Sequence, residues 1–104
     1  MRLQTYELEE AQIREGRQVW VHKTELWVRV RTLRGRLSVR SGVDESLATH
    51  EVRLRYAALV DVGMRFRNGT RVLDIHSIDN IGNHNRWLSC VCEERRLLGG
   101  NESS

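Results

Sequence analysis

The two cysteines, Cys90 and Cys92, are the first residues whose type and spacing could do chemistry. In an extended strand, residues i and i+2 point to the same face, with Cα atoms about 6.6–6.8 Å apart. That separation is at the far limit of disulfide geometry, and known zinc sites place two or more residues between paired cysteines. We therefore expect two buried free thiols, a reducing compartment and no metal site.

The four histidines form no catalytic or metal-binding group in the sequence. They are spread over two strand-like runs, an apolar stretch and a polar turn, at His22, His50, His76 and His84. No Gly-x-Ser-x-Gly nucleophile motif accompanies them, and the glycine spacing matches neither a P-loop nor a dinucleotide fingerprint. We expect no catalytic residues and no cofactor, so the chain is not predicted to be an enzyme.

Arginine dominates the basic residues: Lys23 is the single lysine among 17 lysines and arginines. The planar, weakly hydrated guanidinium suits packed or interfacial ion pairs, although GC-rich codon usage would produce the same bias. A net charge of +3 does not by itself indicate a nucleic-acid-binding protein.

Three tryptophans could act as stacking platforms for single-stranded nucleic acid, as in OB-type barrels. Trp27 is the one we expect on the surface, because it shares the outward face of its strand-like run with Arg29 and Arg31. An exposed tryptophan between arginines serves equally well as the anchor of a protein interface. An OB-like single-stranded nucleic-acid-binding barrel is therefore an alternative to a protein-binding module.

Alternating polarity predicts that these residues are carried by β-strands. In residues 50–56, Val52, Leu54 and Tyr56 share the inward face. Further strands are expected at 3–13, where 7–14 would also tolerate a helix, and at 18–21, 26–32, 64–66, 71–75 and 86–92. Turns are expected at 14–16 and 79–85, and Asn68-Gly69 predicts a type I′ hairpin.

These elements predict an all-β fold, a small antiparallel barrel or sandwich of five to six strands. The length of 104 residues fits one domain, residues 1–97, with a flexible tail at 98–104. No apolar run approaches the ~20 residues of a membrane span, and no secretory signal begins the chain. We expect no membrane contact.

Residues 33–48 do not follow the strand rhythm and include Gly35 and Gly42. Five arginines lie between positions 29 and 40 without an acidic residue. Structureless connections longer than ~12 residues are uncommon in compact domains and often functional. This stretch is either a long projecting loop that meets an anionic or protein partner, or a solvated extension of a hairpin.

The order of five segments resembles the head–tail joining (head-closure, or stopper) family of tailed bacteriophages, also found in prophages and gene transfer agents. Residues 26–36 are similar to its Trp-Ala-Glu-Val-Arg-Pro-Leu-Ser-Gly-Arg pattern, with Thr32 replacing proline and Arg34 replacing serine. Residues 49–56 are similar to its Thr-His-x-Val-x-x-Arg-Tyr strand. Residues 62–66, 69–78 and 83–88 follow in the family's order.

The resemblance implies a virion protein, assembled in the host cytoplasm, that forms a cyclic homo-oligomer of roughly six or twelve copies. The ring would lie below the portal and adaptor proteins and above a tail terminator or tail tube. It would close the DNA channel after packaging and provide the docking surface for the tail.

The resemblance also implies two sets of site residues. A cyclic ring needs two different patches per subunit, and we assign the subunit interface to Trp27, Arg29, Arg31, Glu51, Arg53 and Arg55, with Glu7, Glu9 and Glu10 as further acidic partners. The channel loop would contain Arg34, Gly35, Arg36, Leu37, Arg40 and Gly42.

In that channel loop, Gly35 and Gly42 would act as hinges when the loop moves aside. The loop arginines would contact the packaged DNA end or pair with acids of neighbouring subunits. We favour the pairing with neighbours, because a channel that must release DNA gains little from tight phosphate binding.

Overall fold

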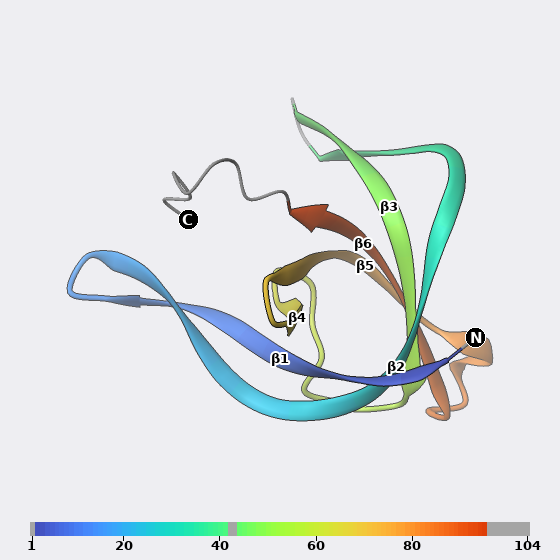
Figure 1. Cartoon of the computed structure of the whole chain (residues 1–104), viewed down its shortest axis with the longest axis horizontal. Coiled ribbons are helices and arrows are strands. Elements are labelled where there is room, and N and C mark those ends of the chain that lie inside the picture. Colours follow the sequence, from blue (N-terminus) through green and yellow to red (C-terminus); the bar gives the residue numbers. More distant parts are fainter. Residues whose placement is uncertain (1, 42–43, 96–104) are drawn as a thin grey trace.

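The computed structural model describes the backbone of residues 2–41 and 44–95, and the side chains of residues 2–33 and 49–95. Six strands follow one another along the chain: β1 (Leu3–Arg14), β2 (Arg17–Ser41), β3 (Asp44–Arg55), β4 (Arg65–Asn68), β5 (Arg71–Asn80) and β6 (Trp87–Arg95) (Figure 1). A short 3-10 helix, Ile81–Asn83, connects β5 to β6. Within the described residues, no helix is long and apolar enough to cross a membrane.

All strand pairs are antiparallel, and the sheet closes on itself in the order β1-β2-β3-β6-β5-β4. The short strand β4 completes the ring, because Phe66 pairs with Leu8 of β1 on one side and with Leu73 of β5 on the other. The predicted all-β antiparallel fold is confirmed.

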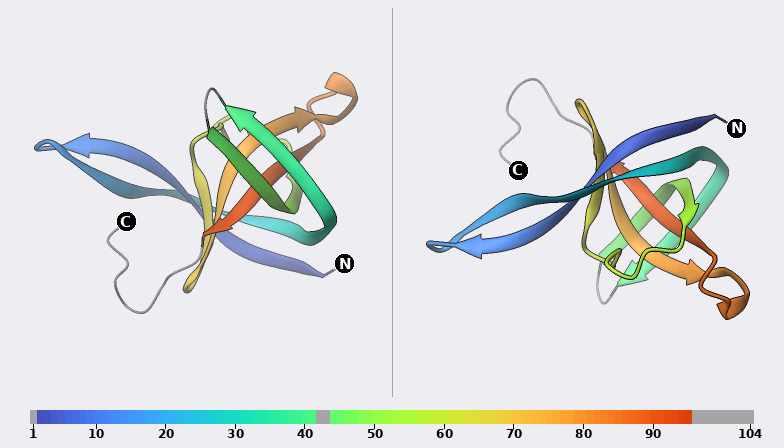
Figure 2. Two further views of the ribbon diagram at one scale, coloured as in Figure 1. Left: turned by 90° about the horizontal axis from the view of Figure 1, so that it is seen from above. Right: turned by 90° about the horizontal axis from the view of Figure 1, so that it is seen from below.

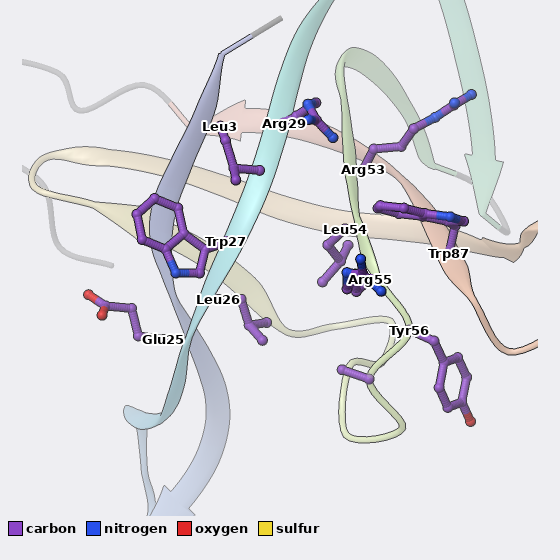
Figure 3. A pocket seen from close by; sticks show the side chains of 11 residues that line it. Leu3, Glu25, Leu26, Trp27, Arg29, Arg53, Leu54, Arg55, Tyr56 and Trp87 are labelled. Carbon is purple, nitrogen blue, oxygen red and sulfur yellow. The ribbon is translucent and has the colours of Figure 1, made fainter.

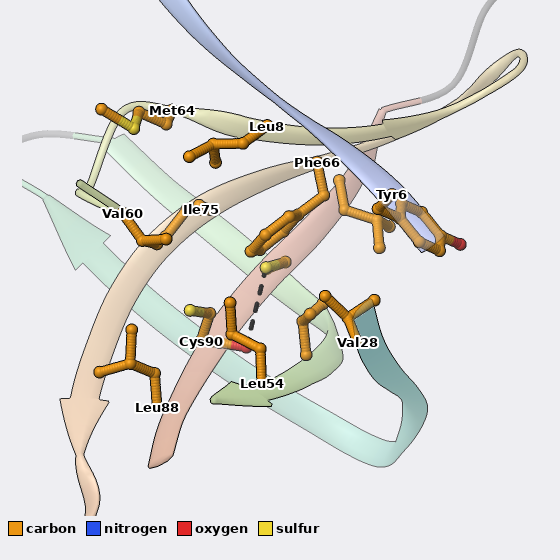
Figure 4. Close-up of a cluster of buried hydrophobic side chains, with 13 residues drawn as sticks. Tyr6, Leu8, Val28, Leu54, Val60, Met64, Phe66, Ile75, Leu88 and Cys90 are labelled. Carbon is orange, nitrogen blue, oxygen red and sulfur yellow. Dashed lines mark hydrogen bonds between the residues drawn. The ribbon is translucent and has the colours of Figure 1, made fainter. Parts of the chain in front are cut away.

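The core is built from the inward residues of every strand (Figure 4). The predicted inward positions Val28, Val52 and Leu54 are buried, as are Leu88, Cys90 and Cys92 of β6. Tyr56 was predicted to face inward and is 39% exposed. It lies beyond the last residue of β3, where the alternation of the strand no longer fixes the direction of its side chain.

The two cysteines are free and buried, as predicted. Burial raises the pKa of the Cys90 thiol to about 12 and also raises the pKa of Cys92. Both thiols are therefore neutral at physiological pH and behave as small apolar core residues.

The β1–β2 hairpin extends beyond the barrel as an arm, which we call the β1–β2 arm (residues 10–21) (Figures 1 and 2). Its tip is the predicted turn, with Glu15 at φ 51° and Gly16 at φ 75°. Two successive positive φ angles are the pattern of a type I′ turn, whose twist matches that of the strands. A register shift between Leu8 and Glu9 separates the arm from the barrel wall.

Residues 33–41 and 44–48 also form a hairpin, which corrects the expectation of an irregular stretch. Leu37 pairs with Ala48 and Ser41 with Asp44, after a register shift between Thr32 and Leu37. The shift breaks the alternation along the sequence, which explains why the stretch does not look like a strand. This is the hairpin extension that we considered beside the loop. Gly42 and the tail 98–104 lie outside the described residues.

The Asn68-Gly69 hairpin forms, but one residue out of the predicted register. Asn68 pairs with Arg71, so Gly69 and Thr70 are the two turn residues. Gly69 has φ 62°, whereas Thr70 is not among the positive-φ residues. A positive φ at the first turn position alone is the type II′ pattern, so the prediction of type I′ was wrong.

Candidate functional site

One outer face of the barrel gathers all six residues that the sequence assigned to a subunit interface. Strand register explains why: Arg29 lies opposite Arg53, Arg31 opposite Glu51, and Arg55 opposite Trp87. These neighbouring residues share one face because directly opposed residues of antiparallel strands point the same way. We call this surface the Trp-Arg face; it consists of Trp27, Arg29, Arg31, Glu51, Arg53, Arg55 and Trp87.

A groove of about 530 Å³ is hollowed into one end of the Trp-Arg face (Figure 3). Its floor and walls include Leu3, Leu26 and Tyr56, together with the indoles of Trp27 and Trp87. Trp27 is 62% exposed and Leu3 47% exposed, although large apolar side chains at these positions gain nothing from water. Exposed aromatic and aliphatic residues in a hollow are typical of a surface that another molecule covers.

Arginines form the rim of this groove. Arg29, Arg53 and Arg55 line it, and a second, polar hollow beside it shares Arg29 and Arg53 and adds Arg31. The guanidinium of Arg55 lies 5.3 Å from the ring centroid of Trp87, within the range of a cation–π contact. The apolar floor is thus bordered by positive charge.

Glu51 is the acidic residue of the Trp-Arg face, and it is engaged within its own chain. Its carboxylate accepts hydrogen bonds from Nη2 of Arg31 at 2.8 Å and from the Ser89 hydroxyl, and Nε of Arg53 lies 3.6 Å away. The Ser89 hydrogen bond, followed by Arg31, lowers the pKa of Glu51 against the opposing effect of burial. Glu51 therefore remains ionised and leaves the face with a net positive charge.

Two arginines of the face have charge to offer to a partner. Among the described side chains, Arg29 and Arg55 have no salt bridge. Interfaces are enriched in arginine and tryptophan, the residue types that most often anchor binding. The Trp-Arg face has both types around one hollow.

Trp87 belongs to this face although it was not among the predicted interface residues. The signal was present in the sequence, because the alternation that turns Leu88 and Cys90 inward turns Trp87 outward. Its 38% exposed indole completes the groove opposite Trp27.

The acids that were expected to serve as partners for a neighbour are engaged inside the chain. Glu9 is 5% exposed and accepts a 2.7 Å hydrogen bond from Nε of Arg65. Glu7 lies 3.1 Å from His22, and Glu10 lies 3.5 Å from Lys23. The prediction left Glu9 free for a neighbouring subunit, whereas its side chain is buried against Arg65, its partner on the adjacent strand β4.

A polar cluster inside the barrel wall explains His50, which is 6% exposed. Nη2 of Arg71 lies 2.8 Å from Nε2 of His50, and Nδ1 of His50 lies 2.7 Å from the Thr49 hydroxyl. Burial and Arg71 lower the pKa of His50, while Glu94 opposes them. A neutral ring that accepts from Arg71 and donates to Thr49 satisfies both nitrogens, so His50 is a structural residue.

Five of the residues predicted for a channel loop lie on the β2 strand of the second hairpin, namely Arg34, Gly35, Arg36, Leu37 and Arg40, whereas Gly42 lies outside the described residues. The register shift of β2 against β3 includes Arg34, Gly35 and Arg36, and Arg40 pairs with Glu45 along the backbone. Among the described residues, no group of three histidine, cysteine or acidic side chains is arranged to hold a metal ion.

Comparison with known proteins identifies the family. The model of the phage head completion protein family matches residues 2–95. The chain belongs to that family. A head completion protein is a structural virion component, so the chain has a structural role at the head–tail region of a phage-like particle.

A solved structure has the same fold. A chain described as "Virion of native gene transfer agent (GTA) particle" superposes with a TM-score of 0.66 at 22% sequence identity. The match covers 95% of this chain and 99% of that chain. No curated protein matches the sequence. The family match agrees with the resemblance noted in the sequence.

Proposed function

We propose that this head completion protein is a head-closure, or stopper, protein. It forms a ring below the portal and adaptor proteins, seals the channel after DNA is packaged, and provides the docking surface for a tail terminator or tail tube. The observation that carries the proposal is the Trp-Arg face: an exposed apolar groove with an arginine rim on a barrel of the head completion family.

The groove is suited to a protein partner. Burying Trp27 and Leu3 against a partner would contribute about 25 cal/mol of binding free energy per Å² of apolar area. The arginine rim would favour a partner surface with acidic or polar groups. A cyclic ring uses two different patches on each subunit, and the Trp-Arg face is our candidate for one of them.

The second hairpin is our candidate for the channel-closing element. Its strands lengthen β2 and β3 beyond the barrel, and the register shift between Thr32 and Leu37 includes Gly35. A bulged, glycine-containing base allows a hairpin to change direction with little loss of backbone hydrogen bonding. We propose that this hairpin faces the lumen, blocks it under DNA pressure, and moves aside when the tail signals.

Deletion of the gene tests the proposed function. We expect heads that package DNA, then lose it, with free tails beside them; nuclease protection and electron microscopy measure both. Complementation with the wild-type chain should restore tailed, DNA-filled particles. Full and stable tailed particles without the chain would refute the head-closure role.

A matched pair of variants tests whether the Trp-Arg face carries this role. Arg53→Glu reverses a charge on the groove rim and should reduce complementation. Arg86→Glu is the control, because Arg86 is exposed but lines neither hollow. Equal complementation by the two variants would contradict the assignment of the face.

The exposed indoles also support a second function, that of an OB-like barrel for single-stranded nucleic acid. Trp27 and Trp87 are both exposed and lie among arginines, the combination that stacks bases and follows a phosphate backbone. Filter binding separates the two functions. Sub-micromolar binding whose affinity falls steeply with salt favours nucleic acid, whereas weak binding at physiological salt favours the structural role.

A further inference from the structure

The tip of the β1–β2 arm exposes an apolar side chain that its own chain does not cover. Ile13 is 72% exposed, more than any other large apolar residue in the described part of the chain. Its neighbours at the turn are charged: Arg14 precedes Glu15, and Arg17 follows the glycine. The tip is therefore a small protruding knob with one apolar residue and charges of both signs.

The groove and the tip lie at opposite ends of the same strand. Leu3 at the start of β1 lines the groove, and Ile13 lies near the end of β1. Ten residue steps along a strand span roughly 33 Å, so Ile13 is far from the groove of its own chain. Figures 1 and 2 show the tip and the N-terminus at opposite ends of the molecule.

The base of the arm is fixed to the barrel by a cluster around Trp20. The guanidinium of Arg65 lies 4.0 Å from the Trp20 ring centroid, and that of Arg95 lies 5.8 Å away. Arg65 in turn donates to the buried carboxylate of Glu9, and Arg95 donates two hydrogen bonds to Asp74. The arm is thereby held in one direction, which reduces the entropy lost when its tip binds.

Tip and groove are complementary in shape and chemistry. The tip protrudes and the groove is concave; the tip offers Ile13 to a floor that contains Leu3 and Trp27. Glu15 matches the arginine rim, and the tip arginines match Glu25 at the groove edge. Two different, complementary patches at opposite ends of a subunit produce a head-to-tail contact, the kind of contact from which cyclic rings are built when the rotation between subunits closes.

We propose that the occupant of the groove is a second copy of this chain. The arm tip of one subunit inserts Ile13 between Leu3 and Trp27 of the next, and Glu15 pairs with the arginine rim. This inference rests on the proposed ring, and it assigns both patches of the subunit contact.

Cysteine cross-linking in assembled particles tests the contact. The chain with Leu3→Cys and Ile13→Cys is supplied to a strain that lacks the gene, and purified particles are oxidised. The natural cysteines are fully buried, so we expect them not to react in the folded chain. We expect a ladder of disulfide-linked oligomers, whereas each single variant stays monomeric. A control that pairs Ile13→Cys with Ser77→Cys, at an exposed residue of β5, should also stay monomeric.

A second variant tests the same contact without a cross-link. Ile13→Ser changes an exposed residue and should leave thermal unfolding unchanged, yet lower incorporation into particles about tenfold or more. Particles that contain the double-cysteine chain and hold DNA but give no ladder overturn the contact. Normal incorporation of the Ile13→Ser chain also overturns it. Neither result affects the head-closure role, which the deletion of the gene tests separately.

Discussion

The buried pair of Glu9 and Arg65 gives the most quantitative test of how the β1–β2 arm is held. The two side chains are 7% and 9% exposed, and Oε1 of Glu9 accepts from Nε of Arg65 at 2.7 Å. Glu9→Gln keeps the shape of the side chain and removes its charge, which leaves a buried guanidinium without an anion. Removing one partner of a buried ion pair costs about 3–5 kcal/mol.

We expect a loss at the lower end of that range, about 3 kcal/mol, because Arg65 keeps its contact with the Trp20 ring. This is a large fraction of the roughly 5–15 kcal/mol that stabilises a typical domain. For a domain of about this size it corresponds to a fall in melting temperature of roughly 12–24 °C. Urea unfolding followed by tryptophan fluorescence measures the free energy of unfolding.

Glu7→Gln is the matched control, because Glu7 lies on the same strand and is 47% exposed beside His22. Its effect should be within about 0.5 kcal/mol of the wild type. The double variant Glu9→Leu with Arg65→Met should recover much of the loss, since apolar residues often replace buried ion pairs without cost. A Glu9→Gln chain as stable as the Glu7→Gln chain would refute the reasoning.

Three further predictions follow from single residues. Because burial and Arg71 lower the pKa of His50, the unfolded chain binds a proton that the folded chain refuses; stability should fall as the pH drops below about 6.5, and His50→Gln should flatten that part of a pH series of urea melts. Cys90 and Cys92, with raised pKa values, should not react with a thiol reagent until denaturant is added. Gly69→Ala should cost about 1 kcal/mol in thermal unfolding, because Gly69 has φ 62°.

Alternating polarity predicted most of the barrel because each strand has one face in the core. Val28, Val52, Leu54 and Cys90 are buried at the expected positions, and Trp27 is exposed. The same alternation brings the predicted interface residues onto one surface, once the register of β2, β3 and β6 is known.

The features that the sequence did not predict depend on how the strands pair, which the pattern of a single strand does not specify. Glu9 is buried because it pairs with Arg65 of β4, and the shift after Thr32 hides a hairpin within a stretch that reads as irregular. The turn at Gly69 is displaced by one residue because pairing of Asn68 with Arg71 sets it, not the Asn-Gly signal alone. Each depends on a partner distant in the sequence, and local patterns do not specify that partner.

The arrangement links the fold to the proposed role. A closed sheet leaves no free edge in the barrel, while two of its hairpins, β1–β2 and β2–β3, reach beyond it in two directions. We propose that one hairpin presents Ile13 to a neighbouring copy and that the other enters the channel. In this proposal the barrel itself supplies the Trp-Arg face that would receive the neighbour.

Imaging the connector of intact particles by electron cryo-microscopy tests the head-closure claim most directly. We predict a ring of this barrel between the portal complex and the tail, with the second hairpin in the lumen of DNA-filled heads. Particles in which the chain is absent from the connector, or in which the lumen at its level is open while the head holds DNA, would contradict the account.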